Sequence, residues 1–207
     1  FLITESANEK YFDASVQMQR KSKNSYFISD TLSQKISETK NSQGVFAVCK
    51  MKNENISLKT DQKYIALDNL QDPGNLGTVI RTAEALGISS VIVGGGCDVF
   101  NPKVLRASMG SVLRLDVFEC QSLAPVLQKA KSLGIKTYAT SPDSSAKKIN
   151  ETQFPKSSLC VIGNEANGVS DEVMNICDET VTIPMLGRAE SLNAHVAGAI
   201  VMWEMLR

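Results

Sequence analysis

From position 64 to the end of the chain, short apolar runs alternate with stretches of helical periodicity. Strands separated by helices need crossover connections, so this alternation predicts an α/β fold with a mainly parallel sheet and helices on both of its faces. The expected strands are 64–67, 91–93, 115–118, 137–139, 159–162 and 180–183, and the expected helices are 76–86, 103–108, 123–133, 171–176 and 192–206.

The first 60 or so residues differ from the rest, because they are rich in Lys, Ser, Asn and Gln and carry a small positive excess. Apolar runs at 1–3 and 44–51 are typical of strands, and Ser29 with Asp30 indicates the start of a helix over 31–36. The polar stretch 52–63 predicts a linker. We therefore expect two domains, a small one over 1–58 and a larger one over 59–207.

Charge and cysteine content exclude several classes of protein. The 22 basic and 22 acidic residues balance, which excludes a strongly basic coat for nucleic acid but leaves room for a local basic patch. No apolar run reaches the ~18 residues of a membrane-spanning helix. Five cysteines without a CxxC pair, and a single histidine, give no zinc-ligand spacing, so we expect no metal. Reduced thiols predict a cytoplasmic protein. The chain begins with Phe1 inside an apolar run, so we expect residues upstream of it.

Ligands of open parallel sheets bind beyond the carboxyl ends of the strands. That rule selects five short segments before any motif is considered. They are 68–69, 94–96, 140–141, 163–165 and 184–185.

The first segment that could take part in binding or catalysis leads into the helix expected at 76–86. The sequence Asp-Pro-Gly at 72–74 indicates a turn, and Asn75 is a suitable N-cap. Arg81 falls opposite the apolar stripe of that helix, among small residues that leave space for an anionic ligand. The alternative is a solvated surface arginine.

The second segment, 159–168, is a buried strand followed by a turn. Gly163 would let a ligand approach the main chain, and Glu165 could hold a hydroxyl, an amine or a basic side chain. The alternative is a structural turn with Glu165 in solvent.

The third segment, 183–193, runs from a strand through a loop that contains Gly187 into a helix. Ser191 could cap that helix, whose free N–H groups could bind polar atoms. The helix is apolar nearly all round, which predicts that a second chain covers part of it, although a simple core helix is the alternative. His195 lies within it and is interpreted as a core or interface residue. The three glycines at 94–96 lack the full dinucleotide fingerprint.

Together, the runs 75–87, 162–168 and 183–193 resemble the three motifs of the SpoU/TrmH family, in the order of that family. This is the SPOUT class of S-adenosylmethionine-dependent RNA 2′-O-ribose methyltransferases. The resemblance extends from about position 64 to the end. Residues 1 to about 58 resemble the later part of an RNA-binding domain similar to ribosomal protein L30e, so we expect this first domain to be incomplete.

The resemblance implies a C-terminal trefoil knot, an exception among folds, and a homodimer that shares its RNA site. It implies S-adenosylmethionine as the cofactor, with the adenine held by main-chain groups and the methyl group directed towards a ribose near Arg81. The implied cofactor-binding residues are Thr140, Gly163, Ile183, Met185 and Leu192. The implied catalytic residues are Asn75, Arg81, Glu165, Ser191 and Asn193.

In this scheme Arg81 engages a phosphate of the target nucleotide and helps to deprotonate the 2′-hydroxyl. Because the pKa of a guanidinium is very high, it is a poor base, and its positioning and electrostatic role is favoured. His195 departs from the small or apolar residue expected after the third motif. The sequence thus predicts 2′-O-methylation of structured RNA, with ribosomal RNA favoured over transfer RNA. The alternatives are a non-catalytic knotted module that binds RNA and a nucleotide-dependent enzyme unrelated to RNA.

Overall fold

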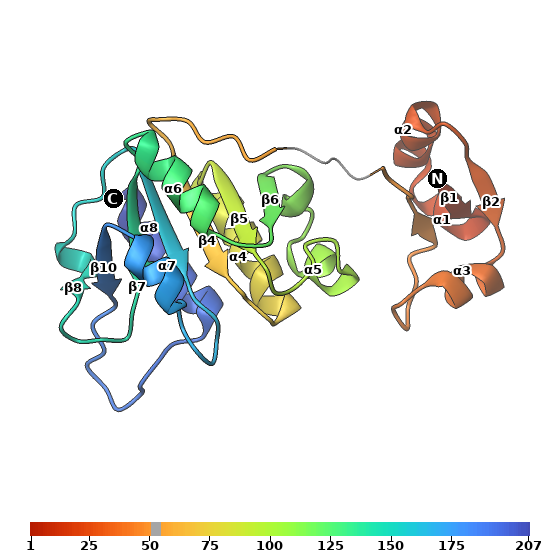
Figure 1. The fold of residues 1–207 in the computed structure, drawn as a ribbon. Helices are drawn as coiled ribbons and strands as arrows, with labels where there is room; N and C mark the ends of the chain where they lie inside the picture. The colour runs from red at the N-terminus through yellow and green to blue at the C-terminus, as the bar shows by residue number, and fades with distance from the viewer. Residues whose placement is uncertain (51–54) are drawn as a thin grey trace. The chain divides into compact units, whose positions relative to one another are not determined.

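The computed structural model describes residues 1–50 and 55–207, which fall into two compact units, Phe1–Asn53 and Glu54–Arg207 (Figure 1). The strand expected at 44–51 and the linker expected at 52–63 both extend into 51–54, outside the described residues. Ile56 and Leu58 pack into the hydrophobic core of the second unit. The second unit therefore begins before the boundary expected between residues 58 and 59.

The first unit contains a three-stranded sheet in the order β2-β1-β3 within residues 1–50. Strand β1 is parallel to β2 and antiparallel to β3. The strands and helices are β1 (Leu2–Thr4), α1 (Glu5–Lys10), α2 (Phe12–Lys21), β2 (Tyr26–Ile28), α3 (Asp30–Ile36) and β3 (Val45–Phe46). The sequence did not predict α1 and α2, because their mostly polar residues give no apolar stripe.

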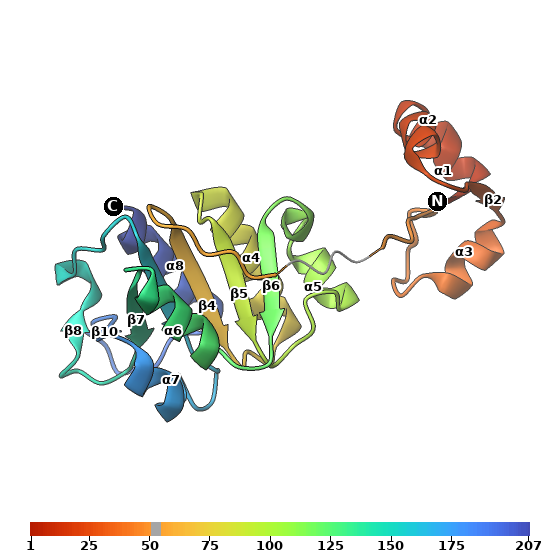
Figure 2. The ribbon, with the colours of Figure 1, turned by 45° about the horizontal axis from the view of Figure 1, so that its top comes forward.

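The second unit is built on a sheet of seven strands within residues 55–207, in the order β6-β5-β4-β9-β7-β10-β8 (Figure 2). All its pairings are parallel, which confirms the predicted α/β class. The strands are β4 (Lys63–Asp68), β5 (Ser90–Gly94), β6 (Asp116–Cys120), β7 (Lys136–Thr140), β8 (Lys147–Lys148), β9 (Ser158–Ile162) and β10 (Glu179–Thr182). Only β8 was not predicted, because two lysines give no strand pattern.

Helices cover both faces of this sheet, with α4 and α8 on one face and α6 and α7 on the other (Figures 1 and 2). The alternation along β4 explains the two layers. Ile65 and Leu67 pack with α4 and α8, whereas Tyr64 and Ala66 pack with α6 and α7. Burying each large apolar side chain contributes about 1.5–3 kcal/mol. The helices are α4 (Pro73–Leu86), α5 (Pro102–Ala107), α6 (Ala124–Ser132), α7 (Asp171–Ile176) and α8 (Ala194–Leu206), with short 3₁₀ turns at Ser111–Leu113 and Ile149–Glu151.

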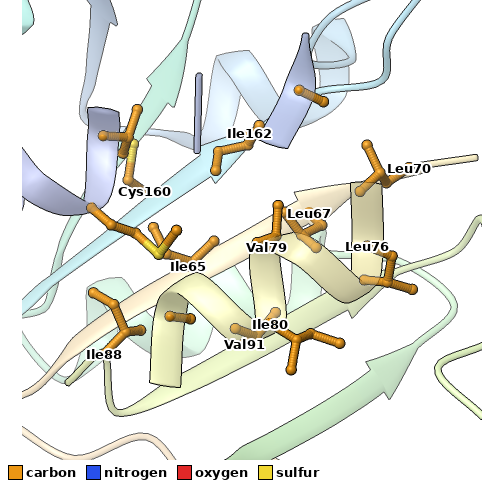
Figure 3. Close-up of a cluster of buried hydrophobic side chains, with 14 of the residues drawn as sticks. Ile65, Leu67, Leu70, Leu76, Val79, Ile80, Ile88, Val91, Cys160 and Ile162 are labelled. Atoms are coloured by element: carbon orange, nitrogen blue, oxygen red, sulfur yellow. The ribbon is translucent and has the colours of Figure 1, made fainter. Parts of the chain in front are cut away.

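The core between α4, α8 and the sheet fixes the position of the site described below. Figure 3 shows Val79 of α4 beside Leu67 of β4 and Ile80 of α4 beside Val91 of β5, with Ile162 of β9 nearby. Gly198 lets α8 approach the sheet closely, since a Cβ atom here would lie only 3.0 Å from the Cδ1 of Ile162. This close approach brings the start of α8 beside the C-terminal end of β9 and the start of α4.

No helix in the described parts of the chain is long and apolar enough to cross a membrane. The trefoil knot stays a prediction.

Candidate functional site

A cavity of about 330 Å³ opens at the carboxyl edge of the parallel sheet. Its walls come from the turns after β7 and β9, the loop after β10 and the first turns of α8. Three of the five segments selected by the strand-end rule, 140–141, 163–165 and 184–185, contribute residues to it. Parallel strands bring these segments together because all their carboxyl ends meet at one edge.

The structure places all five residues predicted to bind a cofactor around this cavity. They are Thr140, Gly163, Ile183, Met185 and Leu192. The hydroxyl of Thr140 donates to the carbonyl oxygen of Val161, at 3.0 Å, and so ties the end of β7 to β9. Sequence reasoning did not single out Met174, Glu190 and Ala197, which also contribute to the walls, because their residue types carry no distinctive signal. Asn164 lies in the segment 163–165 that the strand-end rule selected.

The turn after β9 is closed by two main-chain hydrogen bonds of 2.9 Å between Asn164 and Gly168. Gly163 lies so close to this turn that a Cβ atom would be 2.0 Å from the carbonyl carbon of Gly168. The Asn164 amide also donates to the carbonyl oxygen of Asn69, at 2.7 Å. The turn is therefore tightly built and fixes the direction of the side chain of Glu165.

Glu165 reaches from this turn to the beginning of α4. Its carboxylate accepts a hydrogen bond of 2.9 Å from Nδ2 of Asn75 and two of 3.3 Å from the main-chain N–H groups of Gln71 and Asp72. Partial burial raises the pKa of Glu165, but these hydrogen bonds together outweigh it and hold the pKa below its ordinary value. Glu165 is thus a carboxylate at neutral pH. The residue is exposed, but its carboxylate is hydrogen-bonded to the start of α4.

The prediction that Asn75 caps its helix is also wrong. Asp72 is the N-cap of α4, because its carboxylate accepts from the N–H of Asn75 at 2.8 Å. Pro73 follows at the first helical position, where it loses no hydrogen bond. Asn75 is instead 7% exposed, and its side chain links Glu165 to the Nδ1 of His195, at 3.0 Å. The Asp-Pro pair was the sequence signal for the true start.

In the third motif too, the helix is capped by a different residue from the one expected. Helix α8 begins at Ala194 and is capped by Asn193, whose Oδ1 accepts from the N–H of His195 at 2.9 Å. Ser191 is therefore not the cap, and it lines the cavity from an exposed loop. Asn193 is not among the cavity-lining residues in the described part of the chain. Only Ser191 was predicted as the cap from the sequence, and the true cap lies two residues further along the chain.

Arg81 lies apart from the other predicted residues within one chain. It is exposed on α4, about 9 Å along the helix axis from Asn75, and it does not line the cavity. Within the described residues its side chain makes no hydrogen bond or ion pair. The guanidinium is therefore available to a ligand or to a second chain.

The structure also bears on two other kinds of ligand, a metal ion and a dinucleotide. Within residues 1–50 and 55–207 no group of three His, Cys, Asp or Glu side chains could hold a metal ion. Gly96 packs against the carbonyl of Leu70, where a Cβ atom would lie 2.2 Å away. The three glycines at 94–96 therefore shape a structural turn.

The fold and the site define an α/β protein with a ligand cavity at the carboxyl edge of a parallel sheet and a carboxylate held at its rim. The chain belongs to the SpoU rRNA Methylase family, whose family model matches residues 62–203.

Relatives and solved structures agree with this assignment. The 23S rRNA (guanosine(2553)-2'-O)-methyltransferase RlmP of Bacillus subtilis is 36% identical over 181 residues, which span 87% of this chain and 71% of the relative. The SpoU methyltransferase AviRb of Streptomyces viridochromogenes, in complex with AdoMet, has a TM-score of 0.83 and 28% identity, over 99% of this chain and 80% of that one. An AdoMet-bound rRNA methyltransferase of Sinorhizobium meliloti has a TM-score of 0.81 and 27% identity, over 99% and 78%.

Proposed function

We propose that this protein is an S-adenosylmethionine-dependent methyltransferase that modifies the 2′-hydroxyl of a ribose in structured RNA, with ribosomal RNA favoured over transfer RNA. One observation carries the proposal. Segments 163–165 and 183–192, apart in the sequence, meet around one cavity, and Asn75 is hydrogen-bonded to Glu165 in its wall, in a chain of the SpoU rRNA Methylase family. The name of the Bacillus subtilis relative, a 23S rRNA 2'-O-methyltransferase, supports the choice of substrate.

The cavity suits the proposed cofactor in size and chemistry. Its volume of about 330 Å³ falls within the range of roughly 300–1,000 Å³ that is typical of small-molecule sites. Apolar side chains such as Ile183 and Leu192 could enclose the adenosine. The carboxylates of Glu165 and Glu190, both in the walls, complement the positive charges of its sulfonium and ammonium groups.

When bound, S-adenosylmethionine supplies a methyl group already activated by a positively charged sulfur, so alignment is the protein's main task. We assign Thr140, Gly163, Ile183, Met185 and Leu192 to holding the cofactor. Glu165, fixed by Asn75, would orient the ribose hydroxyl or a neighbouring cation at the rim. Ser191 would stabilise the loop beside it, and Asn193 would fix the start of α8.

We infer that the active site is completed by a second copy of the chain. Val196, Trp203 and Leu206 are exposed on one face of α8, and Trp203 is 61% exposed. Together with Ala199 and Ile200 they form an apolar stripe at helical spacing, while the opposite face of the helix is buried. An exposed apolar stripe favours association. In such a homodimer Arg81 of one copy would approach the cavity of the other and engage a phosphate of the RNA.

The first unit, over residues 1–58 in the domain division expected from the sequence, is proposed to bind RNA in the manner of an L30e-like domain. Its basic excess supports that role. The proposed location is the cytoplasm, and all five cysteines, which lie in the described residues, have free thiols.

Labelled methyl transfer from S-adenosylmethionine to total RNA tests the proposal. We expect label on ribosomal RNA, at a 2′-oxygen, and a homodimer by sedimentation. Binding of S-adenosylmethionine and of RNA without any transfer would indicate a non-catalytic RNA-binding module instead. Calorimetric binding of NAD but not of S-adenosylmethionine would contradict the proposal outright.

A further inference from the structure

The hydrogen bonds around Asn75 determine the orientation of its amide. Glu165 is ionised at neutral pH, so its oxygens only accept hydrogen bonds. The Asn75 atom at 2.9 Å from Oε1 of Glu165 must therefore be the amide nitrogen. The opposite end of the amide, the carbonyl oxygen, then faces the His195 ring.

The same logic assigns the proton on the histidine. The Oδ1 atom of Asn75 is an acceptor without a hydrogen, and it lies 3.0 Å from Nδ1 of His195. Only a protonated Nδ1 can complete that hydrogen bond, so the neutral ring must carry its proton on Nδ1. The main chain of His195 is fixed at the start of α8, because Oδ1 of the N-cap Asn193 accepts from its N–H at 2.9 Å.

We propose that His195 is a positioning residue for methyl transfer: its Nδ1–H fixes the amide of Asn75, and Nδ2 of Asn75 in turn holds the carboxylate of Glu165 at the rim of the cavity. Without the ring, the buried carbonyl oxygen of Asn75 loses the donor Nδ1–H. The amide is then held at one end only and positions the Glu165 carboxylate less firmly. The effect on catalysis rests on the proposed function, whereas the proton position does not.

This arrangement links three elements far apart in the sequence. His195 comes from the first turn of α8, Asn75 from the first turn of α4, and Glu165 from the turn after β9. The imidazole does not line the cavity in the described part of the chain. It therefore acts through Asn75 rather than on the substrate.

The first experiment is ¹⁵N NMR of the imidazole in the chain of 207 residues, at a pH where the ring is neutral. His195 is the only histidine of the chain, so the signals need no assignment. We expect the Nδ1–H tautomer in the unaltered protein and a shift towards Nε2–H in the control variant Asn75→Ala. Nε2–H as the main form in the unaltered protein would overturn the proposal.

The second experiment compares three variants in the methyl-transfer assay. In His195→Asn the amide nitrogen can take the place of Nδ1, in His195→Gln it lies at the distance of Nε2, and His195→Phe has no donor. We expect His195→Asn to keep kcat within about threefold, and the other two to lower it about tenfold with KM for RNA unchanged. Equal kcat for His195→Asn and His195→Gln would overturn the proposal.

Thermal unfolding of each variant separates folding from positioning. If His195→Phe does not fold, the comparison of His195→Asn with His195→Gln still tests whether a donor at the position of Nδ1 is needed. Absence of methyl transfer in the unaltered protein would contradict the proposed function alone, because the NMR experiment would still test the link between His195 and Asn75.

Discussion

Replacing Gly163 with alanine should destabilise the turn that carries Glu165. The added Cβ atom would lie 2.0 Å, 2.2 Å and 2.4 Å from three main-chain atoms of Gly168 and Val169, and a main chain cannot move aside as a flexible side chain can. The turn must open and lose the two hydrogen bonds between Asn164 and Gly168. Each contributes about 0.5–1.5 kcal/mol. Overpacking adds about 1–3 kcal/mol, so the expected loss is about 2–6 kcal/mol.

Urea unfolding followed by circular dichroism measures this loss. A loss of unfolding free energy of this size corresponds to a Tm that is lower by roughly 5–20 °C for a unit of this length. Titration with S-adenosylmethionine should show weaker binding, because the wall of the cavity moves. Gly187→Ala is the matched control, since no atom lies within 4 Å of its added Cβ and its stability should not change. A Gly163→Ala variant within about 0.5 kcal/mol of the unaltered protein would refute the reasoning.

Three further changes test other parts of the site and fold. Arg81→Ala should abolish methyl transfer and leave S-adenosylmethionine binding nearly intact by calorimetry, and equal loss of both would contradict a role on the RNA. Leu192→Asp should weaken cofactor binding, since the adenine would desolvate the new charge; an unchanged Kd would show that the pocket is misplaced. Hydrogen bonds from Arg114 lower the pKa of Glu84 from 4.5 to about 2. This stabilisation is present above pH 4.5 and lost as the pH falls towards 2, so in acid unfolding Glu84→Gln should depend less on pH in that range.

The order of strands and helices could be predicted because each strand of the second unit carries its own apolar signal. The run 64–67 is apolar at every position, as expected for a strand buried on both faces. The strand-end rule then placed residues 140, 163 and 185 at one edge without any knowledge of their neighbours. An apolar run does not indicate which strands lie next to it in the sheet. The position of β9 between β4 and β7 was therefore not predictable.

The starts of α4 and α8 were predicted wrongly because, in each case, two neighbouring residues are suitable as the N-cap. Asp72 and Asn75 both favour an N-cap, as do Ser191 and Asn193, and the difference lies in which side chain is needed elsewhere. The side chain of Asn75 instead makes hydrogen bonds with Glu165 and His195, which lie 90 and 120 positions further along the sequence. No local sequence pattern indicates such contacts.

The sequence by itself determined the α/β class, the α-helices and strands of the second unit apart from β8, and some of the residues around the cavity, because periodicity and strand ends are local properties of the chain. Only the tertiary structure decided that His195, Asn75 and Glu165 form one hydrogen-bonded chain and that Arg81 lies outside it. Hydrogen bonds of about 3 Å depend on how α4, α8 and the turn after β9 pack against one another, and that packing is set by the whole core at once.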